Sequence, residues 1–194
     1  MKATRLLALL TVFVFAGCTG WAIDETEKGW DDFEDGAFSD ARLHFEDATL
    51  YDPTYADAYN GIGWCNLFTD SILSSLTNFD IALSYDLSLV DAKAGGALAA
   101  TEAGEHLTAV NYANDVISGN SSYEFSHYDP VDIWVIRLAK AKSAAAMGDF
   151  DTALEEIQVF DSTFDADPNT NQGQANILAK LEILTGTYGA WAGD

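Results

Sequence analysis

The sequence contains few basic residues. Only 9 of its 194 residues are Lys or Arg, against 31 Asp or Glu, so its formal net charge is −22. Proteins that bind nucleic acids need Lys and Arg to displace the counterions around phosphates, so this composition argues against direct nucleic acid binding. The hydrophobic fraction of 48% is ordinary for a globular protein. The acidic charge therefore does not indicate disorder.

Cysteine and histidine are scarce as well, with 2 and 3 copies. Cys18 ends an apolar run and Cys65 lies far from it, so no disulfide is indicated, and we interpret Cys65 as a small buried apolar residue. His44, His106 and His127 lack the spacing of zinc ligands. The sequence also lacks a Gly-x-Ser-x-Gly elbow and a phosphate-binding loop. We therefore predict no enzymatic activity, no cofactor and no metal site.

The amino terminus has the features of an exported protein. Two basic residues precede an apolar run at 6–16, which is too short for a permanent membrane span and typical of a signal peptide. The run ends in Phe-Ala-Gly followed by Cys18, and this sequence resembles the bacterial lipobox. The resemblance implies a lipoprotein signal peptide at 1–17, lipidation of Cys18, and a short lipidated linker at 18–21.

This resemblance also implies a location. Thr19, rather than Asp, follows the cysteine, which favours the outer membrane over the inner in bacteria that use that sorting rule. We therefore expect a lipid-anchored protein of the bacterial cell envelope. The alternative is an ordinary secretory signal with an incidental cysteine. Removal of residues 1–17 takes two of the 9 basic residues, so the mature chain has 31 acidic against 7 basic residues, a net charge of −24.

A period of 34 residues organises the rest of the chain. Ala41, Phe45, Ala48 and Asp52 recur 34 positions later as Ser75, Phe79, Ala82 and Asp86, and Gly29-Trp30 recurs as Gly63-Trp64. The first three of these residues are spaced i, i+4 and i+7, which places them in one stripe of a helix. Small residues let two helices approach closely while a phenylalanine fills the gap opposite. The repeat therefore predicts helical hairpins.

The period and the Ala-x3-Phe motif resemble those of the tetratricopeptide repeat (TPR) family. That resemblance implies an all-α fold, an α-solenoid of about four TPR-like helical hairpins with a C-terminal capping helix, over residues 22–187. One such hairpin cannot bury its apolar face alone, so the hairpins must stack. The third repeat fits the pattern least, because its first helix contains the consecutive glycines Gly95 and Gly96, which lower helix propensity.

The period breaks once. The next match, at Gly148, comes 44 residues after Gly104 instead of 34. We place the extra residues in an extended surface loop at 118–130, which is rich in Ser, Asn, Tyr and Asp-Pro. Asp132 is then the expected cap of the next helix. A last amphipathic helix is predicted at 175–185.

In the TPR family, one side of each first helix lines a concave groove that receives peptides or partner helices. The matching positions here are Thr26, Trp30 and Phe33 in repeat one, Asn60, Trp64, Leu67 and Phe68 in repeat two, and Ala94, Leu98 and Thr101 in repeat three. The resemblance thus implies partner binding by Trp30, Phe33, Asn60, Trp64, Leu67 and Phe68, with the two tryptophans as a ridge facing the ligand. The alternatives are that these aromatic rings belong to the core, or that the C-terminal helix closes the groove.

The function expected from this resemblance is a lipid-anchored scaffold for protein–protein interaction in the cell envelope. The segment 18–91 has 16 acidic and 2 basic residues, against 15 and 5 in 92–194. The higher density of acidic residues in the first half is compatible with a basic protein or peptide partner. Two alternatives remain. One is carbohydrate or small-ligand binding through the Trp-lined groove. The other is a structural envelope spacer without a groove ligand, whose acidity is an adaptation to a saline habitat.

Overall fold

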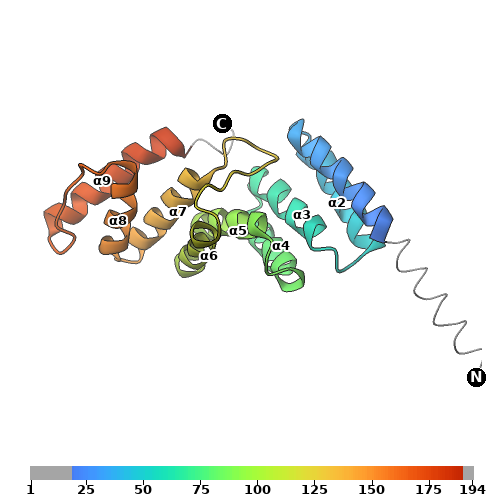
Figure 1. Ribbon diagram of the computed structural model, residues 1–194, viewed down its shortest axis with the longest axis horizontal. Coiled ribbons are helices and arrows are strands. Elements are labelled where there is room, and N and C mark those ends of the chain that lie inside the picture. The colour runs from blue at the N-terminus through green and yellow to red at the C-terminus, as the bar shows by residue number, and fades with distance from the viewer. Residues whose placement is uncertain (1–18, 190–194) are drawn as a thin grey trace, which may run out of the picture.

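The structure is a computed structural model that describes residues 19–189. Apart from one isolated β-bridge, every regular element in this range is a helix. A first helix at 19–34 is followed by α2 (Phe38–Tyr51), α3 (Ala56–Phe68), α4 (Ile72–Tyr85), α5 (Val90–Ala103), α6 (His106–Gly119), α7 (Ile133–Ala146), α8 (Phe150–Phe160) and α9 (Asn171–Tyr188). The predicted all-α solenoid of hairpins with a final helix is confirmed (Figure 1).

The predicted signal peptide and Cys18 lie outside the described residues. The predicted linker at 18–21 is helical from residue 19 onward. None of the helices within residues 19–189 is long and apolar enough to cross a membrane.

The turn inside each hairpin is set by one residue with positive φ. Gly36, Gly104 and Gly148 have φ of 76°, 78° and 82°, and Asp70 has φ of 56° at the same place in repeat two. Glycine adopts this left-handed conformation without strain, and Asp is among the few other residues that tolerate it. The predicted break in the period between Gly104 and Gly148 therefore falls between two hairpins.

The helices form two layers. α3 contacts α5, α5 contacts α7 and α7 contacts α9, whereas α4, α6 and α8 contact only the odd-numbered helices beside them. The odd-numbered helices therefore form the inner, concave layer of the curved array, and the even-numbered helices form the outer layer (Figure 1).

The periodic phenylalanines fill the interior of the array. Phe45 and Phe79 are fully buried, and each ring lies against glycines of the two neighbouring first helices. A Cβ atom added at Gly63 would lie 2.7 Å from Phe79 Cε1, and one added at Gly95 would overlap the same ring from the other side. The glycines that weaken the helix propensity of α5 are thus required by packing.

The last hairpin is held by a buried ion-pair cluster. Glu156 of α8 is 6% exposed, and its carboxylate accepts hydrogen bonds from Arg137 Nη1 and Lys140 Nζ of α7, both at 2.7 Å. One carboxylate with two cationic donors satisfies a charge that would otherwise be costly to bury. This cluster joins α7 to α8.

The caps of the last helices are formed by polar side chains. Asp132 accepts hydrogen bonds from the backbone N–H groups of Trp134 at 2.9 Å and Val135 at 3.2 Å, which confirms the predicted cap of α7. Thr170 accepts from Gly173 N at 3.1 Å and caps α9. α9 covers the apolar side of the last hairpin through Ile177, Leu181 and Leu184, which are buried.

Cys65 is fully buried, as predicted, and burial raises the pKa of its thiol to about 12. The predicted loop at 118–130 is present as a non-helical segment from residue 120 onward, but the expectation that it lies wholly on the surface is wrong. α6 continues to Gly119, and the segment after it buries Tyr123, Phe125 and Val131. We call residues 120–132, which connect α6 to α7, the strap.

Candidate partner-binding site

The strap lies on the concave side of the array (Figure 1). It is closed on itself by backbone hydrogen bonds from Phe125 N to Val131 O at 2.9 Å and from Ile133 N to Tyr123 O at 2.8 Å. Tyr123 and Phe125 are buried, whereas Glu124 between them is exposed. Further turns are closed by hydrogen bonds from Tyr128 N to Phe125 O at 3.2 Å and from Val131 N to Tyr128 O at 3.0 Å. The strap is therefore a compact, turn-rich loop that packs one side against the helices.

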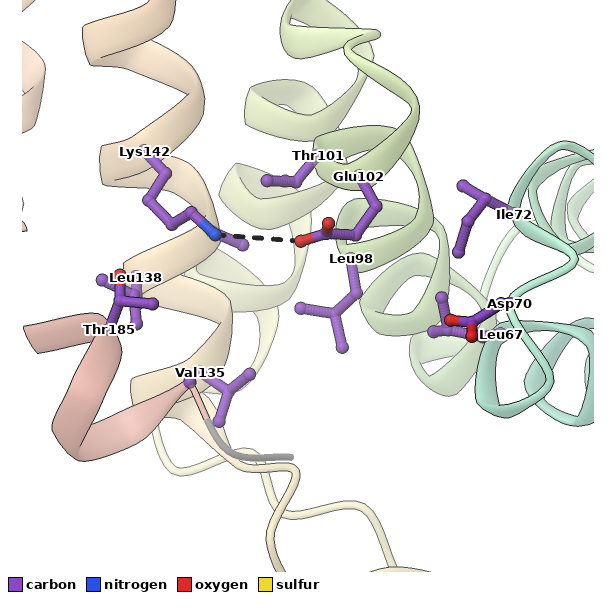
Figure 2. Close-up of a pocket in the computed structure, with 12 residues that line it drawn as sticks. Leu67, Asp70, Ile72, Leu98, Thr101, Glu102, Val135, Leu138, Lys142 and Thr185 are labelled. Atoms are coloured by element: carbon purple, nitrogen blue, oxygen red, sulfur yellow. Dashed lines mark ion pairs between the residues drawn. The ribbon is translucent and has the colours of Figure 1, made fainter. Parts of the chain in front are cut away.

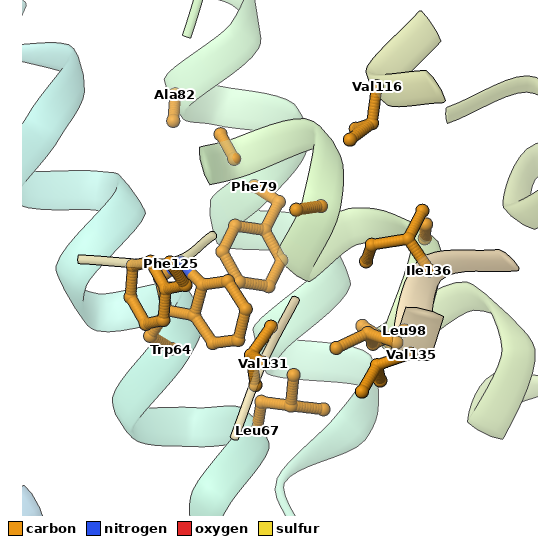
Figure 3. Packing of buried hydrophobic residues seen from close by; sticks show 14 of the residues in the cluster. Trp64, Leu67, Phe79, Ala82, Leu98, Val116, Phe125, Val131, Val135 and Ile136 are labelled. Carbon is orange, nitrogen blue, oxygen red and sulfur yellow. The ribbon is translucent and has the colours of Figure 1, made fainter. Parts of the chain in front are cut away.

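Two rings of the strap stack on the repeated tryptophans. Phe125 lies parallel to Trp64, with ring centroids 4.1 Å apart and an interplanar angle of 16° (Figure 3). His127 stacks on Trp30 with the same centroid distance of 4.1 Å and an angle of 5°. His127 Nδ1 also lies 2.8 Å from Glu34 Oε1. Stacked aromatic pairs stabilise contacts beyond the area they bury, so the strap is specifically seated.

Two aspartates at equivalent positions accept hydrogen bonds in this region. Asp57 Oδ2 accepts from Trp30 Nε1 at 3.0 Å, and Asp57 Oδ1 accepts from Asn60 Nδ2 at 3.0 Å. Asp91 Oδ1 accepts from the hydroxyl of Tyr123 in the strap at 2.9 Å. Burial raises the pKa of the Asp91 carboxyl, and the hydrogen bond from Tyr123 opposes that rise.

Some polar atoms beneath the strap are unpaired. Among the described residues, four buried side-chain polar atoms have no hydrogen-bond partner, and they are Thr26 Oγ1, Asn60 Oδ1, Trp64 Nε1 and His106 Nδ1. The first three belong to the groove side of repeats one and two, at the positions matched to the family. Buried polar groups are normally paired, so this concentration singles out the groove side of the first two repeats.

Beside the strap, the concave surface is hollow. A cavity of about 270 Å³ opens between the end of α3, α5, α7 and α9 (Figure 2). Its apolar lining includes Leu67, Leu98, Val135 and Leu138, and its charged lining includes Asp70, Glu102 and Lys142. Lys142 Nζ lies 3.7 Å from Glu102 Oε1. The cavity thus combines apolar walls with polar groups that could orient a ligand side chain.

The chain resembles known proteins in its structure but not in its sequence. No protein family and no curated protein matches the chain by sequence. Solved structures match it in three dimensions. The structure of YrrB, described as a TPR protein with an unusual peptide-binding site, gives a TM-score of 0.65 at 15% identity, over 86% of this chain and 77% of that one. The chain has the TPR fold.

Two further TPR-fold comparisons agree. A structure of MamA gives a TM-score of 0.59 at 17% identity, covering 85% of this chain and 81% of MamA. A tetratricopeptide repeat protein from Parabacteroides merdae gives 0.58 at 15% identity, covering 88% of this chain and 62% of that one.

In this TPR fold, the six residues predicted to bind a partner are buried or partly buried. Phe33, Asn60, Trp64 and Leu67 are at most 2% exposed, Trp30 is 6% exposed and Phe68 is partly buried. The structure brings their aromatic rings together, and Phe68 contacts Tyr128 of the strap with ring centroids 4.9 Å apart. The tryptophan faces are therefore closed by the chain itself, and partner binding by these residues remains a prediction.

The sequence analysis missed the residues that cover the groove. Phe125, His127 and Tyr128 were assigned only to a surface loop, yet they contact the predicted site. The concentration of aromatic residues in this segment was the available signal, since large aromatic rings are often buried. The walls of the cavity formed by α7 were also missed.

Proposed function

We propose that this protein is a non-catalytic TPR scaffold that binds a protein or peptide partner through its concave surface. The observation that carries this proposal is the strap, an irregular segment whose aromatic side chains pack on the groove side of the first two repeats. A surface that packs the rings of one segment has the chemistry to hold those of another. YrrB has a similar fold and is described as having a peptide-binding site, which also supports a peptide partner.

The proposal includes a lipid anchor at Cys18 and a location in the bacterial cell envelope, at the outer membrane rather than the inner one. It is supported by the resemblance of the residues before Cys18 to the lipobox. The helix at 19–34 follows directly. A lipid on Cys18 would therefore hold the first hairpin close to the membrane surface and leave the rest of the array to extend from it.

A basic partner is supported by the charge of the first half. Lys28 and Arg42 are the only basic residues in 18–91, against 16 acidic residues. Each pairs with a carboxylate of its own helix, Lys28 Nζ with Glu25 Oε1 at 2.7 Å and Arg42 Nη1 with Glu46 Oε1 at 3.3 Å. The excess of carboxylates therefore remains, and such a field attracts cationic partners and raises their association rate.

Site-specific photo-cross-linking in cells of the source bacterium tests the proposal. A benzophenone amino acid is placed at Asp70 or Glu102, which line the cavity, and at Leu73 or Leu107 as controls. The controls are exposed and lie on α4 and α6 of the outer layer. We expect the same adduct from both cavity positions and none from the controls. Adducts confined to Leu73 and Leu107 would contradict binding through the concave surface.

A further inference from the structure

Trp30 and Trp64 occupy equivalent positions, 34 residues apart. The indole N–H of Trp30 donates a hydrogen bond, whereas that of Trp64 has no partner. Trp30 Nε1 donates to Asp57, which lies 27 residues later in the chain. Asp91 lies the same 27 residues after Trp64. If the second repeat followed the first, the indole N–H of Trp64 would therefore donate a hydrogen bond to Asp91. Instead, Asp91 accepts from the Tyr123 hydroxyl of the strap, and Trp64 Nε1 is buried without a partner.

Tyr123 therefore binds Asp91 Oδ1, where the corresponding oxygen of Asp57 accepts from Asn60, and with the strap in place Asp91 does not accept from Trp64. A buried N–H group without a partner is unfavourable, because its hydrogen bonds to water have been lost and not replaced. The arrangement with the strap in place therefore leaves the Trp64 N–H unpaired. An arrangement without the strap can satisfy both Asp91 and Trp64 by one hydrogen bond between them, as Asp57 and Trp30 already show in the preceding repeat.

Displacement of the strap requires few bonds to break. Among the described residues, the side-chain hydrogen bonds from the strap to the first three repeats are Tyr123 to Asp91 and His127 to Glu34, and one backbone bond joins Asn120 N to Val116 O of α6. The remaining contacts are between apolar or aromatic side chains. Both ends of the strap belong to capped helices, with Asn120 at the end of α6 and Asp132 at the start of α7. The caps of α6 and α7 are therefore separate from the contacts of the strap with the groove, whereas departure of the strap exposes the buried side chains of Tyr123, Phe125 and Val131.

We propose that the strap is an internal competitor for the groove, which a basic, aromatic peptide segment of the partner displaces. This inference rests on the proposed function and adds the chemistry of the partner and the control of its access. In the open state, Trp30 and Trp64 present their faces to the incoming segment, and Trp64 donates to Asp91.

The strap itself shows which side chains the groove selects. It places a phenylalanine ring and an imidazole two residues apart, at 125 and 127, on the two tryptophans. A partner segment would place aromatic or cationic groups against the same two rings, because both kinds of group bind the face of tryptophan.

Charge distinguishes the partner from the strap. The strap brings its own exposed carboxylates, Glu124 and Asp129, to a surface that already contains Glu34, Asp57 and Asp91. A segment with Lys or Arg in place of these two residues is attracted to that surface where the strap is repelled. Such a segment can therefore compete with the strap even though the strap is covalently attached.

Two synthetic peptides serve as probes. One has the sequence of residues 120–131, and the other carries Glu124→Lys and Asp129→Lys in that sequence. Each is labelled with fluorescein and titrated with the full mature chain, and binding is followed by fluorescence anisotropy. The proteins compared are the wild type, Tyr123→Phe, which removes the hydroxyl bound to Asp91 and keeps the ring, and Tyr128→Phe as the matched control within the strap.

We expect the basic peptide to bind Tyr123→Phe about tenfold more tightly than the wild type, since a hydrogen bond to a carboxylate that holds the strap is lost. Tyr128→Phe should bind like the wild type. The acidic peptide should bind more weakly to every protein. The indole N–H signal of Trp64 in proton–nitrogen NMR spectra, assigned with Trp64→Phe, should move in Tyr123→Phe toward the position of a hydrogen-bonded indole.

Other outcomes overturn the inference in distinct ways. Equal affinity of the basic peptide for the wild type and Tyr123→Phe would show that the strap does not compete, while concave cross-links would still support the proposed function. Equal affinity for both peptides would exclude the charge selection. Should Tyr123→Phe not fold by circular dichroism, a variant with a Gly-Ser segment in place of 122–130 replaces it. Failure of that variant, when folded, to bind the basic peptide would refute the proposed partner chemistry.

Discussion

Phe125 of the strap lies face to face with Trp64 of α3, with ring centroids 4.1 Å apart. This contact links the inserted segment between α6 and α7 to the second repeat. Phe125 is 1% exposed and Trp64 is completely buried, so each ring covers the other. The same region contains all six residues that the sequence matched to a binding groove, and the groove is thus occupied by part of the chain.

A first prediction concerns the different roles of two buried phenylalanines. Phe79→Ala should lower the free energy of unfolding by about 3–5 kcal/mol, because Phe79 is enclosed by helices on both sides. Phe125→Ala should cost about 2 kcal/mol or less, because the strap can move without opening a helix. Urea denaturation measures both values. Acrylamide quenching of tryptophan fluorescence should increase in folded Phe125→Ala. An equal loss of stability in the two variants would mean that the strap is part of the core.

The glycines of α5 give a second prediction. Gly95→Ala should destabilise the protein by about 1–3 kcal/mol, although alanine is the better helix former by about 1 kcal/mol, because the new methyl group overlaps the Phe79 ring. Gly186→Ala in α9 is the control. A Cβ atom there meets no other atom within 4 Å, so this variant should be more stable by about 0.5 kcal/mol. Stabilisation by both substitutions would contradict the packing described for Phe79.

A third prediction tests the ion-pair cluster of the last hairpin. Glu156→Ala should cost about 2–3 kcal/mol, because Arg137 and Lys140 lose a shared, largely buried partner. The cost stays below that of a fully buried pair because the two cations keep 17% and 15% of their side-chain surface exposed. Glu155→Ala removes an exposed neighbouring carboxylate and should change stability by less than about 0.5 kcal/mol. Thermal unfolding measures the stability of both variants. An equal change in the two would indicate a general effect of removing negative charge and not the loss of the ion-pair cluster.

The proposed lipid anchor at Cys18 gives a fourth prediction. Cys18→Ser should move the protein from the membrane to the soluble fraction of the source bacterium, or leave its signal peptide uncleaved, because stable attachment requires more than one acyl chain. Thr19→Asp is the matched variant. It should keep the protein attached but shift it to the inner membrane if the sorting rule applies. Unchanged membrane attachment of Cys18→Ser would refute lipidation at this position.

The hairpins could be predicted from the sequence because the determinants repeat locally. Phe45 and Phe79, together with the glycines that they contact, are spaced so that each hairpin forms the same contacts as the one before it. Even α5 follows this rule, since Gly95 is needed for close approach although it disfavours a helix. Asp132, the cap of α7, could be identified because a helix cap depends on residues next to it in the sequence.

The state of the groove could not be predicted in the same way. The interval of 44 residues between Gly104 and Gly148 locates an insertion but does not show where its side chains pack. The contacts of Phe125 and His127 join the insertion to the first two repeats, far away in sequence. A period of 34 contains no information about such contacts, because they occur once in the chain.

The measurement that tests the central claim most directly is amide hydrogen exchange of the mature chain with and without the basic peptide. Protection of the amides of Phe125 and Ile133 reports the closed strap, because these groups donate to Val131 O and Tyr123 O. We predict that the peptide lowers protection at these two amides and leaves that of α3 and α5 unchanged or higher. Bound peptide with undiminished protection of Phe125 and Ile133 would contradict a groove shared by the strap and a partner.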